Sequence, residues 1–324
     1  MKPVYRTKQG QLFNARIEDA LETPAMKAVL GKVNLIMTSP PFPLVRKKKY
    51  GNETGQQYVT WLKSLAPRLS NLLAEDGSIV IEIGNAWEAG KPVMSTLPLE
   101  ALLAFKGAGN LELCQHAICH NPARLPSPAA WVNVERIRLK DSFTHVWWLA
   151  KTPRPQADNR RVLTPYRKHM QRLLSSQRYN AGHRPSGHKI SEKGFLTDHG
   201  GAIAPNVVDP ENLPESLMRF SNTGWDAGYR RYCADHGLEP HPARMQPELA
   251  AFFIEFLTQT GDLVVDPFAG SNTTGAIAEA LGRRWLCVEA DAAYAAGSWG
   301  RFEAGDNAGV NTQAAGRSSG AEAR

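Results

Sequence analysis

The sequence contains few cysteines and no long apolar run. Its four cysteines in 324 residues include no C-x-x-C pair, which speaks against a disulfide framework. No apolar stretch approaches the roughly 18 residues of a membrane-spanning helix, and the polar, basic stretch Met1–Gly10 lacks the apolar core of a signal peptide. We therefore expect a cytoplasmic protein with no membrane partner.

Sequence patterns typical of metal-binding sites are also scarce. The nearest approach is the run Cys114–His120, CQHAICH, but its spacing matches no common zinc site. The same run is typical of a strand with side chains on both faces. We therefore expect no bound metal.

Acidic residues are nearly missing from one long segment. Residues 151–193 hold eleven lysines and arginines but only two acids, Asp158 and Glu192, so the net charge of this segment is +9. The whole chain has a net charge of +7, so the remaining residues together carry −2. Such a concentration is typical of a protein that binds a polyanion, most often nucleic acid. A solvated basic surface is the alternative.

The hydrophobic pattern predicts an α/β protein, because short apolar strands alternate with amphipathic helices. The expected strands are Val33–Thr38, Ser78–Ile83, Leu111–His120, Phe143–Lys151, Asp262–Asp266 and Trp285–Val288. The expected helices are Gln56–Ala74 with a kink at Pro67, Leu97–Phe105, Gln246–Thr260, a segment ending near Leu281, and Asp291–Phe302. Asp76-Gly77 is a predicted turn.

Periodicity weakens between the two α/β stretches. Residues 151–240 are rich in Pro, Gly, Arg, His and Asn, and a structureless loop of that length inside one domain is unusual. We therefore predict a separate small domain or a large insertion there. It divides an α/β domain into the halves 1–150 and 241–303, and a flexible tail, 304–324, follows.

The stretch Pro267–Gly275, PFAGSNTTG, is typical of a nucleotide-binding turn between a strand and a helix. Gly270 lets the backbone approach a ligand closely, and Glu289, at the end of the next strand, can accept hydrogen bonds from ribose hydroxyls. The turn has one glycine fewer than a pyrophosphate cradle needs. A ligand with a ribose and no phosphates, such as S-adenosylmethionine, therefore fits better, and an ordinary turn is the alternative.

A second unusual stretch, Thr38–Phe42, ends the first long strand with the sequence TSPPF. Prolines fix φ and have no N–H, so the backbone there presents carbonyl oxygens in fixed directions, and the Ser39 hydroxyl adds an acceptor. Phe42 offers a flat face on which a ring could stack. These features predict a pocket for a nucleobase with an exocyclic amino group. A tight proline turn with a packed Phe42 is the alternative.

Taken together, the two motifs resemble the β-class exocyclic-amino DNA methyltransferases, and within them the PvuII-type, cytosine-N4-specific branch. The resemblance covers about Asn14 to Phe302, and its catalytic motif precedes its cofactor motif, the permuted order of that class. It implies a Rossmann-like, mostly parallel methyltransferase sheet with an inserted target-recognition domain at 151–240. The stretches that carry it are Thr38–Asn52, Asn121–Thr152, Arg184–His188 and Val264–Asp291.

The resemblance also implies three sets of site residues. The catalytic set is Ser39, Pro40, Pro41 and Phe42. The S-adenosylmethionine set is Asp19 near the adenine, Thr38, His241 near the methionine end, Asp266, Phe268, Gly270, Ser271, Asn272, Thr273 and Glu289. The DNA-contacting set is Arg46, Lys47, Lys48, Lys49, Arg160, Arg161, Arg167, Lys168, Arg184 and His188. Asn272 replaces the usual glycine, and asparagine tolerates positive φ better than most residues.

The implied reaction moves a methyl group from S-adenosylmethionine to the amino group of a base flipped out of duplex DNA, and leaves S-adenosylhomocysteine. Cytosine N4 is favoured because serine often accompanies cytosine in the family. Adenine N6 stays open, since it presents the same amino group beside a ring nitrogen. Carbon-5 methylation needs a cysteine nucleophile, usually after proline, and none of the four cysteines follows a proline.

Two other classes stay open on the sequence. One is an RNA methyltransferase, which a requirement for single strands or a 2′-hydroxyl would reveal. The other is a DNA-binding regulator that keeps the fold without turnover. The further expectations are a homodimer, a cognate restriction nuclease as a genetic partner only, and a place at the bacterial nucleoid.

Overall fold

The computed structural model describes residues 1–42, 53–179, 182–190, 196–209, 213–220 and 224–303. Within these residues one sheet has the strand order β1-β2-β11-β10-β3-β4-β6-β5-β9. Its strands are β1 (Tyr5–Arg6), β2 (Gly10–Asn14), β3 (Val33–Thr38), β4 (Leu73–Gly84), β5 (Glu112–His120), β6 (Phe143–Ala150), β9 (Val207–Val208), β10 (Leu263–Asp266) and β11 (Arg284–Glu289). The five strands from β2 to β4 in this order run parallel, which confirms the mostly parallel methyltransferase sheet.

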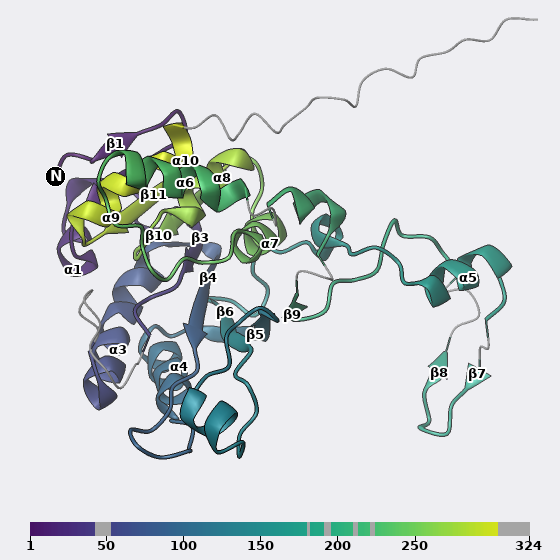
Figure 1. The fold of residues 1–324 in the computed structure, drawn as a ribbon. Coiled ribbons are helices and arrows are strands. Elements are labelled where there is room, and N and C mark those ends of the chain that lie inside the picture. Colours follow the sequence, from purple (N-terminus) through teal and green to yellow (C-terminus); the bar gives the residue numbers. More distant parts are fainter. Residues whose placement is uncertain (43–52, 180–181, 191–195, 210–212, 221–223, 304–324) are drawn as a thin grey trace, which may run out of the picture.

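Helices cover both faces of this sheet (Figure 1). One core joins alternate strand residues such as Ile36 and Val265 to the helices α1, α2, α3 and α4. The opposite core joins Leu35 and Val264 to α7, α8 and α9. The helices are α1 (Ile17–Ala20), α2 (Pro24–Lys27), α3 (Gly55–Leu72), α4 (Leu97–Ala108), α7 (Pro247–Leu257), α8 (Thr273–Ala280), α9 (Ala292–Gly297) and α10 (Gly300–Glu303). Burial on both faces explains why β3 and β10 are almost continuously apolar.

The sheet register brings together two motifs that are far apart in the sequence. Val265 of β10 pairs with Ile36 of β3, and the two strands run parallel. Their carboxyl ends therefore lie at the same edge of the sheet, where parallel α/β sheets bind their ligands. The stretch after Thr38 and the turn after Asp266 begin side by side at this edge.

The predicted strands and helices are confirmed, with shifted ends, apart from two details. Asp76-Gly77 is not a turn, because β4 begins at Leu73, directly after α3, and these residues lie where its register with β3 is irregular. The expected helix Asp291–Phe302 is divided into α9 and α10. The short strands β1 and β2 were not predicted.

The described part of residues 151–240 consists of elements that pack against the α/β domain and elements that project away from it. The 3₁₀ helices Asn159–Val162 and Glu215–Phe220 pack against α7, β9 pairs with β5 at the sheet edge, and α6 (Gly224–Asp235) packs against α10. By contrast, α5 (Lys168–Ser176) and the hairpin of β7 (Gly182–His183) and β8 (Lys189–Ile190) project away from the sheet in Figure 1. The division into domains stays a prediction, and the projecting part is the narrower candidate for a separate unit.

Two properties of the described residues bear on the sequence expectations. In these segments no helix is long and apolar enough to cross a membrane. The same part of the chain holds no group of three His, Cys, Asp or Glu side chains that could hold a metal ion. The expectation that the protein needs no metal stays a prediction.

Candidate functional site

A cavity of about 570 Å³ opens at the carboxyl edge of β3, β10 and β11. Its volume lies within the range of small-molecule sites. Residues of both sequence motifs line it. The predicted residues that line it are Ser39, Pro40, Pro41, Phe42, His241, Asp266, Phe268, Gly270, Ser271, Thr273 and Glu289.

Three predicted cofactor residues do not line the cavity. Thr38 and Asn272 are buried beneath its wall. Asn272 has φ 55°, as the sequence comparison with glycine anticipated, and its side-chain oxygen accepts the Gly275 N–H at 3.1 Å to cap α8. Asp19 lies on α1 outside the lining, whereas its neighbour Glu18 faces the cavity.

Asp266 ties the two motifs together. Its buried carboxyl accepts hydrogen bonds from Thr38 Oγ1 at 2.6 Å, from Thr274 Oγ1 at 2.7 Å and from the Phe268 N–H at 3.0 Å. Burial raises the pKa of Asp266, and the three hydrogen bonds oppose that rise. The carboxyl therefore fixes the end of β3 and the turn after β10 relative to each other.

Thr274→Val is expected to lower the free energy of unfolding by about 1–3 kcal/mol at neutral pH, because Asp266 Oδ2 loses its hydrogen bond at 2.7 Å inside the core. The variant raises the folded-state pKa of Asp266 further. When a carboxyl has a raised pKa in the folded state, the free energy of unfolding falls as the pH rises through that pKa. The difference in stability between the variant and the parent protein should therefore shrink in acid. Urea unfolding at two pH values measures it.

The control for this prediction is Thr60→Val, since Thr60 is exposed on α3. It should change stability little. Equal stability of Thr274→Val and the parent protein at neutral pH would contradict the structural role of Asp266.

Glu289 closes the opposite side of the turn. Its carboxyl oxygens accept the Gly270 N–H at 2.7 Å and the Asp291 N–H at 2.8 Å, and Gly270 has φ 53°. Burial raises the pKa of Glu289, and the two backbone hydrogen bonds oppose it. A desolvated carboxylate held in this way keeps lone pairs for further donors. Its chemistry fits the two hydroxyls of a ribose.

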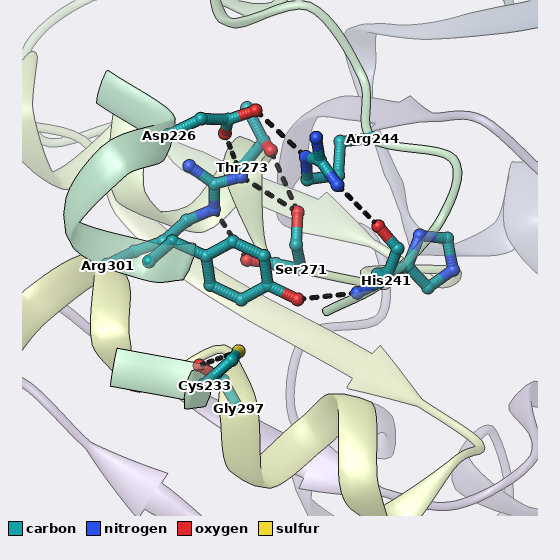
Figure 2. A network of polar contacts seen from close by, with 9 residues as sticks. Asp226, Cys233, His241, Arg244, Ser271, Thr273, Gly297 and Arg301 are labelled. Atoms are coloured by element: carbon teal, nitrogen blue, oxygen red, sulfur yellow. Dashed lines mark hydrogen bonds and ion pairs between the residues drawn. The ribbon is translucent and has the colours of Figure 1, made fainter. Parts of the chain in front are cut away.

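An ionic network fixes the segment between α6 and α7 (Figure 2). Asp226 of α6 accepts hydrogen bonds from Arg244 Nε at 2.8 Å and from Arg301 Nη2 at 2.9 Å. Although burial opposes it, the two arginines hold the pKa of Asp226 below its ordinary value. Arg301 also donates to the Ser271 carbonyl at 2.7 Å, and Arg244 donates to the His241 carbonyl at 2.7 Å. The network joins α6 and α10 to the turn after β10.

Next to Ser39, behind the cavity lining, lies a buried acid that the sequence reasoning missed. Glu82 of β4 is buried, and its carboxyl is hydrogen-bonded by the Ser39 side chain and by Thr144 Oγ1, the latter at 2.9 Å. Burial raises the pKa of Glu82. The sequence did contain an indication of this site, since an acid lies within the apolar run SIVIEI. A buried acid is costly without a hydrogen-bond partner.

Aromatic side chains form the remaining walls. The Phe42 ring packs on the end of β4, where a Cβ added to Gly84 would lie 2.6 Å from ring atom Cε2. Trp61 of α3 meets Phe268 edge to face with ring centroids 5.5 Å apart, and its Nε1 donates to Glu18 at 2.7 Å. Trp61 and Glu18 are further lining residues that sequence reasoning missed.

Of the predicted DNA-contacting residues, those that the structure describes do not line the cavity. Arg46, Lys47, Lys48 and Lys49 lie outside the described residues. Arg160 pairs with Asp158 at 2.8 Å, and Arg161 donates to the Phe256 carbonyl at 2.8 Å, both beside α7. Arg167 and Lys168 begin α5, and Arg184 and His188 lie at the β7–β8 hairpin. The last four residues belong to the projecting part of Figure 1.

Known proteins resemble the chain over most of its length. Residues 33–298 match a family model described as DNA methylase, of the N6/N4 methyltransferases. The type II methyltransferase M.PvuII of Proteus hauseri is 39% identical over 303 residues, 93% of this chain and 86% of that protein. The solved PvuII DNA methyltransferase, cytosine-N4-specific, aligns with TM-score 0.70 and 33% identity over 93% of this chain and 89% of its own.

A more distant structure shares the fold. The M1.HpyAVI–SAM complex aligns with TM-score 0.50 and 15% identity, over 91% of this chain and 99% of its own. The matches confirm the resemblance inferred from the sequence motifs and the fold class that it implied.

Proposed function

We propose, since the chain belongs to the N6/N4 DNA methylase family, that it transfers a methyl group from S-adenosylmethionine to the exocyclic amino group of a base in duplex DNA. Cytosine N4 is the favoured target, in keeping with the cytosine-N4-specific PvuII enzyme. The observation that carries this proposal is the position of Ser39–Phe42 across one cavity from Gly270 and Glu289. Adenine N6 stays the alternative.

The cofactor turn fits S-adenosylmethionine. We propose that Glu289 accepts the ribose hydroxyls, that the Gly270 backbone allows close approach, and that Ser271, Thr273 and His241 lie toward the methionine end. When bound, the cofactor supplies a methyl group on a positively charged sulfur. Asp266, Thr38 and Asn272 then act by shaping the turn, as their hydrogen bonds indicate.

The adenine end is assigned by burial and contact. Phe268 and Trp61 provide apolar faces for a purine, and Glu18, which accepts a hydrogen bond from Trp61, can accept another from an exocyclic amino group. We propose Glu18 for the role that the sequence assigned to Asp19, because Glu18 lines the cavity.

The base pocket holds the amino group by its hydrogens. The Ser39 hydroxyl and the Pro40 carbonyl accept one N–H each, and Phe42 stacks on the flipped ring. Because Ser39 is also hydrogen-bonded to Glu82, its hydroxyl proton can point toward that carboxyl and leave a lone pair for the base. The two acceptors favour positive charge on the nitrogen and leave its lone pair free to attack the methyl group.

The proton leaves after the methyl group is transferred. A serine hydroxyl is too weak a base to remove an amino proton first. Once the nitrogen carries positive charge, its proton is acidic and can pass to solvent. Positioning and electrostatic stabilisation therefore supply most of the rate.

DNA recognition is proposed for residues 151–240, with the projecting α5 and β7–β8 hairpin as the part that reaches along the duplex. Arg167, Lys168, Arg184 and His188 would contact phosphates or base edges there. Arg160 and Arg161 are proposed as phosphate contacts nearer the sheet, and Arg46 to Lys49 as contacts beside the flipped base. The basic charge of the segment supports this assignment.

The setting of the enzyme is also a proposal. We place it in the bacterial cytoplasm, at the nucleoid, because its substrate is genomic DNA. A homodimer and a cognate restriction nuclease as genetic partner are further proposals, the second supported by similarity to a type II methyltransferase. No metal is proposed, since the mechanism needs only hydrogen-bond acceptors around the amino group.

The test of this function uses methyl-labelled S-adenosylmethionine with duplex DNA, single-stranded DNA and RNA of one sequence. We expect label in duplex DNA only. Label in RNA alone would assign the protein to the RNA methyltransferases. Tight duplex binding without label would assign it to the regulators.

Gly84→Ala is expected to lower kcat/KM for DNA methylation at least about 10-fold, the loss that corresponds to 1.4 kcal/mol. The added Cβ would lie 2.6 Å from the Phe42 ring, so the stacking face must move. Gly107→Ala on α4 is the matched control, because a Cβ there meets nothing within 4 Å. Full activity of Gly84→Ala in steady-state assays would show that Phe42 does not hold the base.

A further inference from the structure

Arg124 lines the cavity together with the catalytic motif, and the proposed mechanism gives it no role. Its Nη1 donates to the Phe143 carbonyl at 2.9 Å and lies 3.9 Å from Asp141 Oδ1. Its Nε and Nη2 have no hydrogen-bond partner among the described residues, and 32% of the side chain is exposed. One arm of the guanidinium is therefore anchored while the other donors are available to a ligand.

A hydrogen-bonded chain keeps this anchor in place. Asn85, also at the cavity, donates from Nδ2 to Asp141 Oδ1 at 2.8 Å. Its Oδ1 lies 2.9 Å from His145 Nε2, and His145 Nδ1 lies 2.9 Å from His116 Nε2. Because the Asn85 amide nitrogen must face the carboxylate, its oxygen faces His145, which then carries a proton on Nε2. Asp141 cannot rotate without breaking this chain.

Arg124 is linked to the proposed amino-group acceptor Ser39 through the chain, because its partner Phe143 precedes Thr144, whose Oγ1 donates to Glu82 at 2.9 Å. Its positive charge lowers the pKa of the Glu82 carboxyl, against the larger effect of burial, and that carboxyl is hydrogen-bonded to Ser39. Arg124 and Ser39 thus line one cavity and both act on the Glu82 carboxyl. A base whose amino group is held by Ser39 presents its adjacent edge to this region.

That edge differs between the two candidate bases. In cytosine, the atoms next to the amino-bearing carbon along the Watson–Crick edge are N3 and then O2, both acceptors. In adenine they are N1, an acceptor, and then C2–H, which accepts nothing. An arginine fork can give two hydrogen bonds to the first edge and one to the second.

We propose that Arg124 is a specificity-determining residue that donates to N3 and O2 of the flipped cytosine and thereby selects cytosine over adenine. The inference rests on the proposed function and adds the group that reads the base. A site built to hydrogen-bond a substrate group rejects the analogue that lacks it, since the donor is then left unpaired. Ser39 and Pro40 can accept hydrogen bonds from the amino group of either cytosine or adenine, so in this proposal Arg124 determines which base is preferred.

The test compares duplexes that differ only at the mapped target position. One carries cytosine, one adenine, and one the 2-aminopyridine C-nucleoside, which keeps an amino group beside a ring nitrogen and lacks the 2-oxygen. We expect the parent enzyme to prefer cytosine over the analogue about 10- to 50-fold in kcat/KM, as a specific bidentate contact provides. Arg124→Met should lose this preference while methylating adenine at a nearly unchanged rate.

The controls separate base reading from charge and folding. Arg136→Met changes an exposed arginine of the same segment and should leave all three rates unchanged. Arg124→Lys keeps the charge without the planar fork, and we expect it to resemble Arg124→Met. Because the analogue is tested with the parent enzyme, the result does not depend on the folding of a variant.

Several outcomes would overturn the inference. The first is an equal rate of the parent enzyme on cytosine and the analogue, and the second is an equal loss on cytosine and adenine in Arg124→Met. Recovery by lysine, with the salt slope of DNA binding reduced by about one unit in Arg124→Met, would make Arg124 a phosphate contact. Methylation of adenine by the parent enzyme at a kcat/KM equal to or above that for cytosine would refute the inference and leave the methyltransferase function, whereas no DNA methylation would refute both.

Discussion

Ser39→Ala is expected to lower the single-turnover rate of methyl transfer by about 10²- to 10³-fold, the loss seen when one polar group that stabilises transition-state charge is removed. The hydroxyl is placed to accept an amino hydrogen, and its bond to buried Glu82 orients it. The residue lies across the cavity from Glu289, so the Kd for S-adenosylmethionine should stay within about two-fold, far below the ten-fold change that 1.4 kcal/mol represents. Rapid-quench assays and calorimetry measure the two quantities.

The matched control is Ser64→Ala, since Ser64 is exposed on α3 and bonds only to the Trp61 carbonyl in the described structure. Its rate should equal that of the parent. Loss of cofactor affinity by Ser39→Ala would mean that the two sides of the cavity are not independent. A rate within about three-fold of the parent, under 1 kcal/mol, would remove Ser39 from the mechanism.

Glu289→Gln is expected to raise the Kd for S-adenosylmethionine about 100-fold, the size of two charge-assisted hydrogen bonds. Both carboxyl oxygens already accept a backbone N–H, from Gly270 at 2.7 Å and from Asp291 at 2.8 Å. The amide nitrogen of glutamine must therefore face one of these donors. Ribose hydroxyls also lose the charged acceptor, and isothermal titration calorimetry measures both effects together.

The pH dependence gives this prediction a second readout. Burial raises the pKa of Glu289 above its ordinary value, and the ligand binds the charged form. Affinity should therefore be full above the raised pKa and fall as the pH drops through it, at higher pH than for an exposed glutamate near 4.3. Glu289→Gln should abolish that fall. The exposed Glu135→Gln should retain it, and a parallel decline in both variants would contradict the assignment.

Much of the fold could be predicted because its central parallel strands are almost continuously apolar. The run VNLIMT of β3 and the run LVVD of β10 have buried residues on both faces, as a central parallel strand requires. The strand order was not readable from such runs. Thr38 and Asp266 bond at 2.6 Å across 228 residues of sequence, and only the sheet brings them together.

The candidate site was predictable where a local motif carries its own geometry. The prolines of Ser39–Phe42 and the turn around Gly270 are such motifs, and both line the cavity. Glu82 and Arg124 were not predicted, because each is placed by a partner on another strand or segment, Ser39 and the Phe143 carbonyl respectively. The resemblance pointed to Asp19, whereas Glu18 lines the cavity. A one-residue step on a helix turns the side chain by about 100°, so the motif alone does not decide which of the two acids faces the site.

The central claim is that this cavity methylates the amino group of cytosine. Mass spectrometry of nucleosides from duplex DNA treated with the purified protein and deuterium-methyl S-adenosylmethionine tests it most directly. The account predicts labelled N4-methylcytosine, with the label missing in the Ser39→Ala reaction over the same time. Labelled N6-methyladenine as the product would contradict the assigned base, and 5-methylcytosine would contradict the mechanism itself.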